Sequence, residues 1–171
     1  IAVLLKVLCG FSTAEIARAF LASVAAIEKR IARGKRALVA SRTLVDLREG
    51  GALSARQLAE RQVAVCQALY LLFNEGFLAS SAQRTEDGIR AEVCAEAMRL
   101  AGLLLESEAT DGPVPRALLA LMCFHSARLP ARRDARGNLV LLMDQDRTTW
   151  DSALILRGFA LLQASDPEAH L

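Results

Sequence analysis

The chain has 171 residues, 53% of them hydrophobic and only 5% aromatic, which provides enough aliphatic surface for one globular domain or two small ones. Its longest strongly apolar stretch, residues 117–127, is too short to span a bilayer, and its four cysteines lie far apart without a C-x-x-C pair. These features exclude a membrane segment and predict buried thiols in a cytoplasmic protein.

The composition favours helices nearly throughout the chain. Only four prolines and ten glycines occur, and no long run alternates apolar and polar residues. We therefore expect an all-α protein. The first segment, residues 1–9, is already apolar and helical in character but has neither an N-cap nor an initiating methionine. We expect the chain to be a fragment that begins inside an element.

A capped helix is predicted next. Ser12 is a good N-cap, and Glu15 three residues later completes an S-x-x-E capping box, so the helix is expected to begin at Thr13. Leu21 and Ala22 are expected to make the turn that follows. The apolar residues of this helix recur at helical spacing and should pack inward: Ile16, Ala17 and Phe20.

A second helix is predicted after the turn, with Ser23 as its N-cap. Its apolar residues fall on one side and should also pack inward: Val24, Ile27, Ile31 and Leu38, with Gly34 between them. The opposite side is basic. Residues 28–42 hold six basic side chains against Glu28 alone, a local charge of +5, whereas residues 43–171 carry a net −4 within a total of only +2. Such a local positive stripe suits phosphate groups.

The two ends of the second helix are expected to play different roles. In helix-turn-helix proteins the N-terminal end of the second helix meets base edges, and a glutamate there can accept a hydrogen bond from a cytosine amino group. The basic side chains further along contact phosphates. The predicted DNA-binding residues are therefore Ser23, Ala25, Ala26, Glu28, Lys29, Arg30, Arg33, Lys35 and Arg36.

The simpler interpretation of a basic helix is a solvated face with no partner. Here the spacing argues against it, because two capped helices joined by a short turn, with the basic face confined to the second, match a helix-turn-helix in mechanism as well as in pattern. We therefore expect this segment to bind DNA.

The segment GFSTAEIARAF, followed by S-x-x-A-I-x-K-R-I-x-R-G-K-R, resembles region 4 of bacterial sigma factors of the extracytoplasmic-function group. The resemblance implies recognition of the upstream (minus 35) promoter element, with promoter DNA and the RNA polymerase core as partners. It also implies that residues 1–9 form the helix that packs under the helix-turn-helix. Val24 departs from the pattern, because an acidic residue or proline is expected in the first helical turn.

A linker is predicted at residues 39–53, where periodicity is weak and Gly50 and Gly51 favour a turn. Ser54 is expected to cap a helix that runs to about Phe77. The stretch 64–73 of that helix is apolar almost all round, so we expect it to be the most buried helix of the second domain, with Tyr70 in the core.

Three further helices are predicted. Thr85 is expected to cap the first, and the second should run from about Val114 to Leu129 after the break at Gly112 and Pro113. Asp146 or Thr148 is expected to cap the third. That third helix should contain Trp150, Leu154, Ile155 and Leu161, with Trp150 in the core, and residues 139–143 before it could be extended.

Three stretches sharpen the resemblance: LYLLFNEGF at 69–77, CAEAMRLAGLL at 94–104 and DARGNLVLLMDQDRTTWD at 134–151. They are similar to the C-terminal, tetratricopeptide-like helical extension of one subgroup of these sigma factors. The resemblance implies a sigma region 4-like helix-turn-helix domain at 1–38, a linker at 39–53 and a helical extension at 54–171. The extension is expected to have a control role, with a possible protein partner.

Enzymatic interpretations have less support. Asn74 with Glu75, or Asp144 with Asp146, could supply catalytic carboxylates, and a Cys123–His125 pair could begin a metal site, but each set has too few partners. We therefore expect no catalysis, cofactor or metal. The main alternative to a sigma factor is a transcriptional regulator or adaptor whose helical domain is a protein-interaction scaffold.

Overall fold

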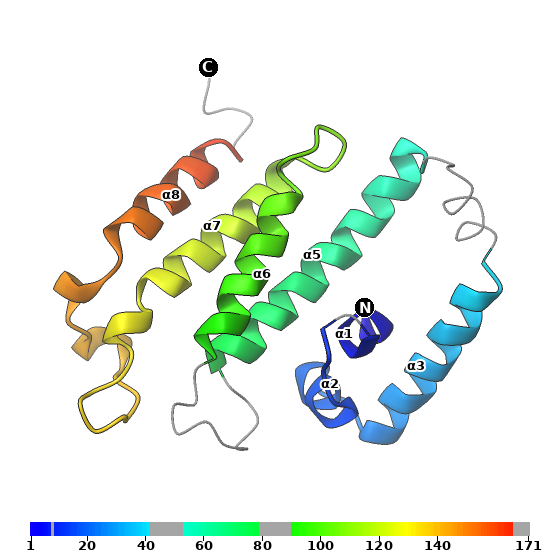
Figure 1. Cartoon of the computed structure of the whole chain (residues 1–171), viewed down its shortest axis with the longest axis horizontal. Coiled ribbons are helices and arrows are strands. Elements are labelled where there is room, and N and C mark those ends of the chain that lie inside the picture. The colour runs from blue at the N-terminus through cyan, green and yellow to red at the C-terminus, as the bar shows by residue number, and fades with distance from the viewer. Residues whose placement is uncertain (8, 42–52, 79–89, 166–171) are drawn as a thin grey trace. The chain divides into compact units, whose positions relative to one another are not determined.

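The computed structural model describes residues 1–7, 9–41, 53–78 and 90–165, and these are helical apart from turns and one isolated antiparallel bridge between Arg133 and Leu139 (Figure 1). The predicted all-α fold, with a helix-turn-helix followed by a helical domain, is confirmed. The chain forms two compact units, Ile1–Leu72 and Phe73–Leu171. None of the described helices is long and apolar enough to cross a membrane.

The first unit contains α1 (Ala2–Val7), α2 (Thr13–Ala19), α3 (Val24–Val39) and most of α5 (Ala55–Leu78). Both α1 and α2 contact α3, and they bury Leu5, Phe11, Ile16 and Ile27 between them. Burial of one large aliphatic side chain contributes about 1.5–3 kcal/mol, so these contacts hold the short helices that could not persist alone. The helix expected over residues 1–9 is present at Ala2–Val7 and packs against the helix pair.

Gly34 permits the close approach of α1 to α3. A Cβ atom at this position would lie 2.5 Å from Cγ2 of Val3, which is closer than carbon atoms tolerate. Two of the inward assignments on α3 are wrong, because Val24 is 44% exposed and Leu38 is 45% exposed. Periodicity places a residue on one side of the helix, but burial also requires a neighbouring element beside that residue.

The start of α5 follows the prediction. Ser54 Oγ accepts a hydrogen bond from the Gln57 amide at 3.3 Å, and Gln57 Oε1 accepts one from the Ser54 amide at 3.0 Å, so the two residues form a reciprocal cap. The expectation that the stretch 64–73 is buried all round is wrong, since Tyr70, expected in the core, is 43% exposed. The predicted linker falls mostly outside the described residues, so the domain boundaries remain a prediction.

In the second unit, α7 (Pro113–Ala127) is the central helix. It contacts both α6 (Ala91–Leu103) and α8 (Ser152–Gln163), and it carries more fully buried side chains than its neighbours, among them Leu119, Met122 and Cys123. The most buried helix is therefore α7 and not the 64–73 segment of α5. A helix flanked on two sides buries more of its surface than its sequence periodicity alone predicts.

The C-terminal part of α5 meets α6 closely. The Arg90 amide donates a hydrogen bond to the Gly76 carbonyl oxygen at 2.8 Å, and Cys94 Sγ lies 3.7 Å from the Phe73 carbonyl oxygen. The helix predicted to start after Thr85 begins at Ala91, with Arg90 at the N-cap position and no side-chain cap. Thr85 itself lies outside the described residues.

The start of α8 also differs from the prediction. Asp146 caps a single 3₁₀ turn, η3 (Arg147–Thr149), through the Thr148 amide at 2.9 Å, and Asp151 caps α8 through the Leu154 amide at 3.0 Å. Trp150 precedes α8 and is half-buried, so it is neither a helix residue nor a fully buried core aromatic. Two further 3₁₀ turns, η1 (Leu129–Ala131) and η2 (Leu142–Asp144), complete the described elements. The predicted extended run 139–143 therefore contributes only the bridge at Leu139 and the first residues of η2.

Candidate nucleic-acid interface

The capping box fixes where the helix pair begins. Ser12 Oγ accepts a hydrogen bond from the Glu15 amide at 3.1 Å, and Glu15 Oε2 accepts one from the Ser12 amide at 2.6 Å. Two amides that lack helical partners are thereby satisfied, which typically stabilises a helix start by about 1 kcal/mol. The start of α2 at Thr13 is confirmed.

The turn between α2 and α3 is held by backbone hydrogen bonds back into α2. The Leu21 amide donates to the Arg18 carbonyl oxygen at 3.0 Å, and the Ala22 amide donates to that of Ala17 at 2.9 Å. Ser23 then caps α3, because its Oγ accepts from the Ala26 amide at 3.2 Å. The chain thus passes from one capped helix to the next within a few residues, as the helix-turn-helix interpretation predicts.

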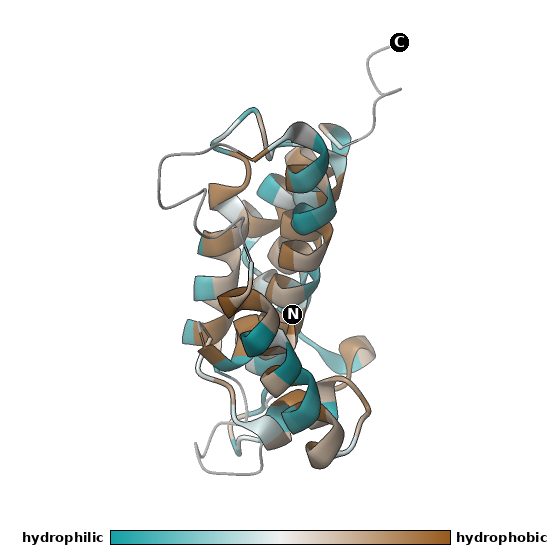
Figure 2. Ribbon diagram, turned by 90° about the vertical axis from the view of Figure 1, so that its right-hand side faces the viewer, coloured by the Kyte–Doolittle hydropathy of each residue, from teal (hydrophilic) through white to brown (hydrophobic). Residues whose placement is uncertain are grey.

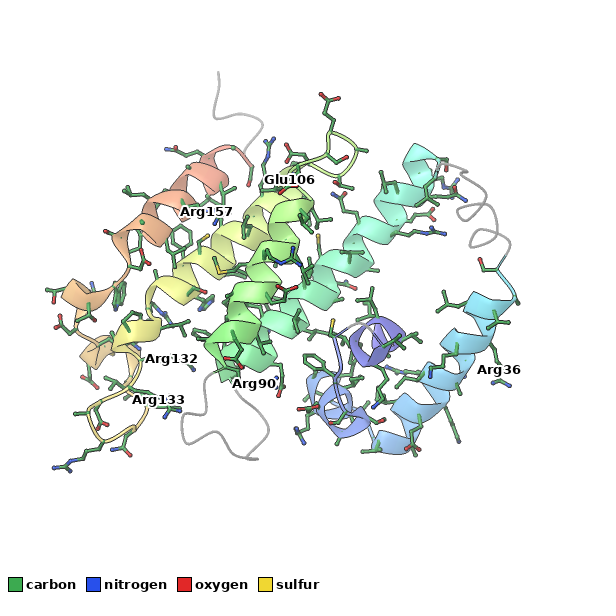
Figure 3. All side chains as sticks on the ribbon, in the orientation of Figure 1. Arg36, Arg90, Glu106, Arg132, Arg133 and Arg157 are labelled. Carbon is green, nitrogen blue, oxygen red and sulfur yellow. The ribbon has the colours of Figure 1, made fainter. Side chains whose placement is uncertain are left out.

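Packing sets the rotation of α3 about its axis. Ile27 is fully buried and Ile31 is 9% exposed, so the side that carries these two residues faces α1 and α2. The opposite side must then face solvent. Hydrophilic residues recur along α3 (Figure 2). The side chain of Arg36 projects on the side of α3 away from α1 and α2 (Figure 3).

The basic residues of α3 are exposed, as the sequence predicts. None of them forms an ion pair with an acidic side chain among the residues that the structure describes. Uncompensated cations on one helix face create a local positive potential that attracts polyanions. This basic face consists of Lys29, Arg30, Arg33, Lys35 and Arg36.

The N-terminal end of α3 presents little side-chain bulk. Ala25 and Glu28 are exposed, whereas Ala26 is half-buried and its amide is already bonded to Ser23. No acidic residue lies in the first turn of α3. The helix end is therefore open to an approaching surface, and Glu28 is the longest of the predicted reading side chains. The assignment of these residues to DNA remains a prediction.

Sequence reasoning missed two features of this unit. Leu21, assigned only to the turn, is 97% exposed and has a positive φ of 49°. A hollow of about 660 Å³ lies between α1 and the C-terminal half of α3. Sequence periodicity could not have revealed this hollow, because its size depends on how α1 packs along α3. Its walls are formed by Ile1, Val3, Leu4, Val7, Gly34, Ala37, Leu38 and Ser41.

A groove of about 580 Å³ lies in the second unit, between α6 and α8. Small residues on α6, including Ala91, Ala95 and Gly102, leave space on that wall, and Leu154 and Arg157 line the other. A groove of this size can hold a peptide segment or a small molecule. The sequence alone could not reveal it, because its walls come from elements about fifty residues apart.

Two residues considered for catalysis or metal binding, Asp146 and His125, make contacts that stabilise the fold. Asp146 is engaged at the cap of η3, and its hydrogen bonds with Thr148 lower its pKa. Burial lowers the pKa of His125, and the positive charges of Arg128 and Arg132 lower it further. The imidazole ring packs edge-on against the Phe77 ring, with 5.0 Å between the ring centroids.

Cys123, the proposed partner of His125, is fully buried, and burial raises the pKa of its thiol. Glu75, which follows Asn74 on α5, is also buried, with 6% of its surface exposed. Across residues 1–7, 9–41, 53–78 and 90–165, no group of three or more His, Cys, Asp or Glu side chains is placed to hold a metal ion. Because the Cys123 thiol and the Glu75 carboxylate are both buried, a substrate could not easily reach them.

Comparison with known protein families gives a match for each half of the chain. Residues 61–166 match the model of a family of unknown function, DUF6596. The chain belongs to the DUF6596 family. Residues 1–38, which lie outside that match, match sigma-70 region 4. The chain thus joins a region 4 helix-turn-helix to a DUF6596 segment.

One relative is an uncharacterised protein of Rhizobium meliloti (strain 1021), 40% identical over 162 residues. The match takes in 95% of this chain and 36% of the relative, so the chain spans about a third of that protein's length. No solved structure matches the chain.

Proposed function

We propose that the protein of which this chain is part is a bacterial sigma factor of the extracytoplasmic-function group. In this proposal α3 recognises the minus 35 promoter element, the RNA polymerase core is the partner, and the DUF6596 segment is a tetratricopeptide-like regulatory extension. The protein would act in the cytoplasm and carry out no catalysis of its own. The observation that carries the proposal is the exposed basic face of α3, placed on a doubly capped helix pair within the region 4 match.

Three physical features support DNA as the ligand. The basic face carries five cations without described acidic partners, the N-terminal end of α3 is open, and the buried Ile27 and Ile31 fix the helix orientation. Phosphate contacts supply most of the affinity of such surfaces, and base contacts supply the selectivity. The DUF6596 segment supports a regulatory role through its groove, which offers a concave surface for a protein partner.

The direct test is transcription by purified RNA polymerase core with and without the complete protein. We expect transcription from a subset of promoter fragments only when the protein is added, with a shared upstream element among the fragments used. If the protein binds DNA but never supports initiation by the core, the sigma-factor proposal is wrong.

The alternative is a transcriptional regulator or adaptor that uses the DUF6596 segment as a protein-interaction scaffold. The groove between α6 and α8 is the observation that favours it. In the same assay a regulator would alter transcription only when another sigma factor is already bound to the core. A transcript that requires this protein alone would exclude that alternative.

A further inference from the structure

The composition of α8 is that of a helix covered on more than one side. Eight of its 12 residues are apolar, and Arg157, its single charged residue, lines the groove between α6 and α8. A helix that carries charge on only one flank normally packs against neighbours over the rest of its surface. The main neighbour of α8 among the described helices is α7, which covers one side of it.

The side of α8 turned away from α7 is exposed and uncharged. Gly158 faces α7, because a Cβ atom added there would lie 2.7 Å from Cε1 of Phe124. On the other side, exposed residues recur at intervals of three and four. Phe159 flanks them, with its ring edge-on to Phe124 at 5.1 Å. Leu156 is 70% exposed and Phe159 is 54% exposed. This outer face of α8 consists of Ala153, Leu156, Phe159, Ala160 and Gln163.

A solvated helix face in the same unit has a different composition. The exposed side of α6 carries Glu92, Glu96 and Arg99, and the last two residues form an ion pair at 2.8 Å. The outer face of α8 has Gln163 as its one polar side chain. In a stack of helices the terminal helix needs a polar outer face to stay in solution. Because α8 lacks such a face, it has the character of an internal helix.

The order of packing indicates what covers this face. In the second unit each described helix packs on the one before it in sequence. The Arg90 amide at the start of α6 bonds to Gly76 of α5, α7 contacts α6, and α8 contacts α7 at the edge of the array (Figure 1). Elements that are adjacent in sequence are usually adjacent in space. The Rhizobium relative has further chain to supply, because the match takes in 36% of its length.

We propose that the outer face of α8 is the docking surface for the next helix of the complete protein, supplied by the residues that follow Leu171. That helix presents an uncharged apolar side to Leu156, and the small Ala153 and Ala160 on either side allow it to approach closely. The DUF6596 segment is then one part of a longer helical stack. This inference concerns packing within the chain, so it holds whether or not the protein is a sigma factor.

The test is photo-crosslinking in the complete protein, with Leu156 replaced by benzoylphenylalanine. Mass spectrometry identifies the peptide that becomes joined to this position. A mixture of isotope-labelled and unlabelled protein separates bonds within one molecule from bonds between two molecules. The control carries the same replacement at Glu96, on the charged side of α6. Each protein is irradiated with and without the polymerase core.

We expect position 156 to be joined to residues beyond Leu171 of the same molecule, in both the presence and the absence of the core. Position 96 should give no defined product. A product between two molecules would assign the outer face to a dimer, and a product formed only with the core would assign it to the polymerase. Either of these results, or the absence of a defined product from position 156, would overturn the inference.

A stability measurement provides an independent answer. Leu156→Glu retains a good helix former but introduces a charge, whereas Leu156→Met retains an apolar side chain. If the outer face is covered, Leu156→Glu should lower the Tm of the complete protein by about 4 °C or more, because an unpaired carboxylate is buried. Leu156→Met should leave the Tm within about 1 °C. Equal Tm values for the two variants would show that the face is in water and that the inference is wrong.

Discussion

The cations of α3 differ from two arginines of the second unit in what surrounds them. Arg99 and Arg116 are paired with Glu96 and Asp111 at 2.8 and 2.5 Å, whereas Lys29 and the other members of the basic face have no acidic partner among the described residues. Surface pairs of this kind contribute little to stability, at most about 1 kcal/mol. The unpaired cations are thus available for phosphates.

Removing one cation from this face should weaken DNA binding in a salt-dependent way. Lys29→Ala and Arg33→Ala are each expected to lower affinity and to reduce the slope of log K against log salt by about 1, because one fewer counterion is released. Fluorescence anisotropy at several salt concentrations measures both quantities. Arg136→Ala, in an exposed turn of the second unit, is the matched control. If the double variant Lys29→Ala, Arg33→Ala has the same slope of log K against log salt as wild type, the basic face does not bind phosphates.

Glu28 should affect the choice of promoter more than the affinity for DNA. A carboxylate gains nothing from phosphate, but it can accept a hydrogen bond from a cytosine amino group. Glu28→Ala in the complete protein is therefore expected to change the sequence selected from a randomised minus 35 library. If the same sequence is selected with similar strength, the reading residues lie elsewhere on the helix.

At the scale of the elements, most helix starts could be predicted from local signals, whereas burial could not. The caps at Ser12, Ser23 and Ser54 are confirmed because a cap depends on residues within one turn. Tyr70 and Leu38 were misplaced because burial depends on which helix lies opposite, and that information is not in a helix's own periodicity. For the same reason the basic face could be predicted from sequence, while the groove and the hollow could not.

The cap of α8 was missed for a local reason. Asp146, Thr148 and Asp151 all carry side chains suited to capping, and the two that act as caps, Asp146 and Asp151, lie only five residues apart. Asp146 starts a single 3₁₀ turn that ends before Trp150, so a second cap is needed at Asp151. Sequence spacing alone does not say which cap leads into the long helix.

The contact between α5 and α6 can be tested at one glycine. A Cβ atom on Gly76 would lie 2.9 Å from the Arg90 carbonyl oxygen and 2.9 Å from the Cys94 amide nitrogen. Because backbone atoms cannot move aside easily, Gly76→Ala is expected to destabilise the chain by about 1–3 kcal/mol.

The matched control is Gly102→Ala on α6, where an added Cβ meets nothing within 4 Å. It should be stabilising by about 0.5–1 kcal/mol, since alanine is the better helix former. Chemical denaturation measures both variants. Equal stability of the two would show that α5 and α6 do not approach as closely as the structure places them.

At the scale of the whole molecule, we expect the DUF6596 segment to regulate the helix-turn-helix that precedes it. Its central helix α7 is covered on two sides, and its groove is open to a partner, which suits control better than chemistry. Deleting everything after Leu53 is expected to change either promoter output or its response to conditions. Reporter transcription from the complete protein and from the deletion, at matched protein levels, measures this. Identical output and response would mean that the DUF6596 segment is not a regulatory module.

In the proposed function the N-terminal end of α3 lies on the upstream promoter element. This placement can be tested with an iron chelate, a reagent that cleaves nearby DNA. The chelate is attached to a cysteine introduced by Ala25→Cys, at an exposed position, or by Val39→Cys, at the last residue of α3. The two sites are separated by about 20 Å along the helix. Cys9 and any exposed cysteine outside this chain are replaced by serine in both proteins, whereas Cys66, Cys94 and Cys123 are buried and are kept.

The labelled complete proteins are bound to a promoter together with the polymerase core, and the positions of strand cleavage are mapped. We predict strong cleavage within the minus 35 element from Ala25→Cys, and weaker, displaced cleavage from Val39→Cys. Cleavage from Ala25→Cys that is scattered or absent at that element, or equally strong cleavage there from Val39→Cys, would contradict the account.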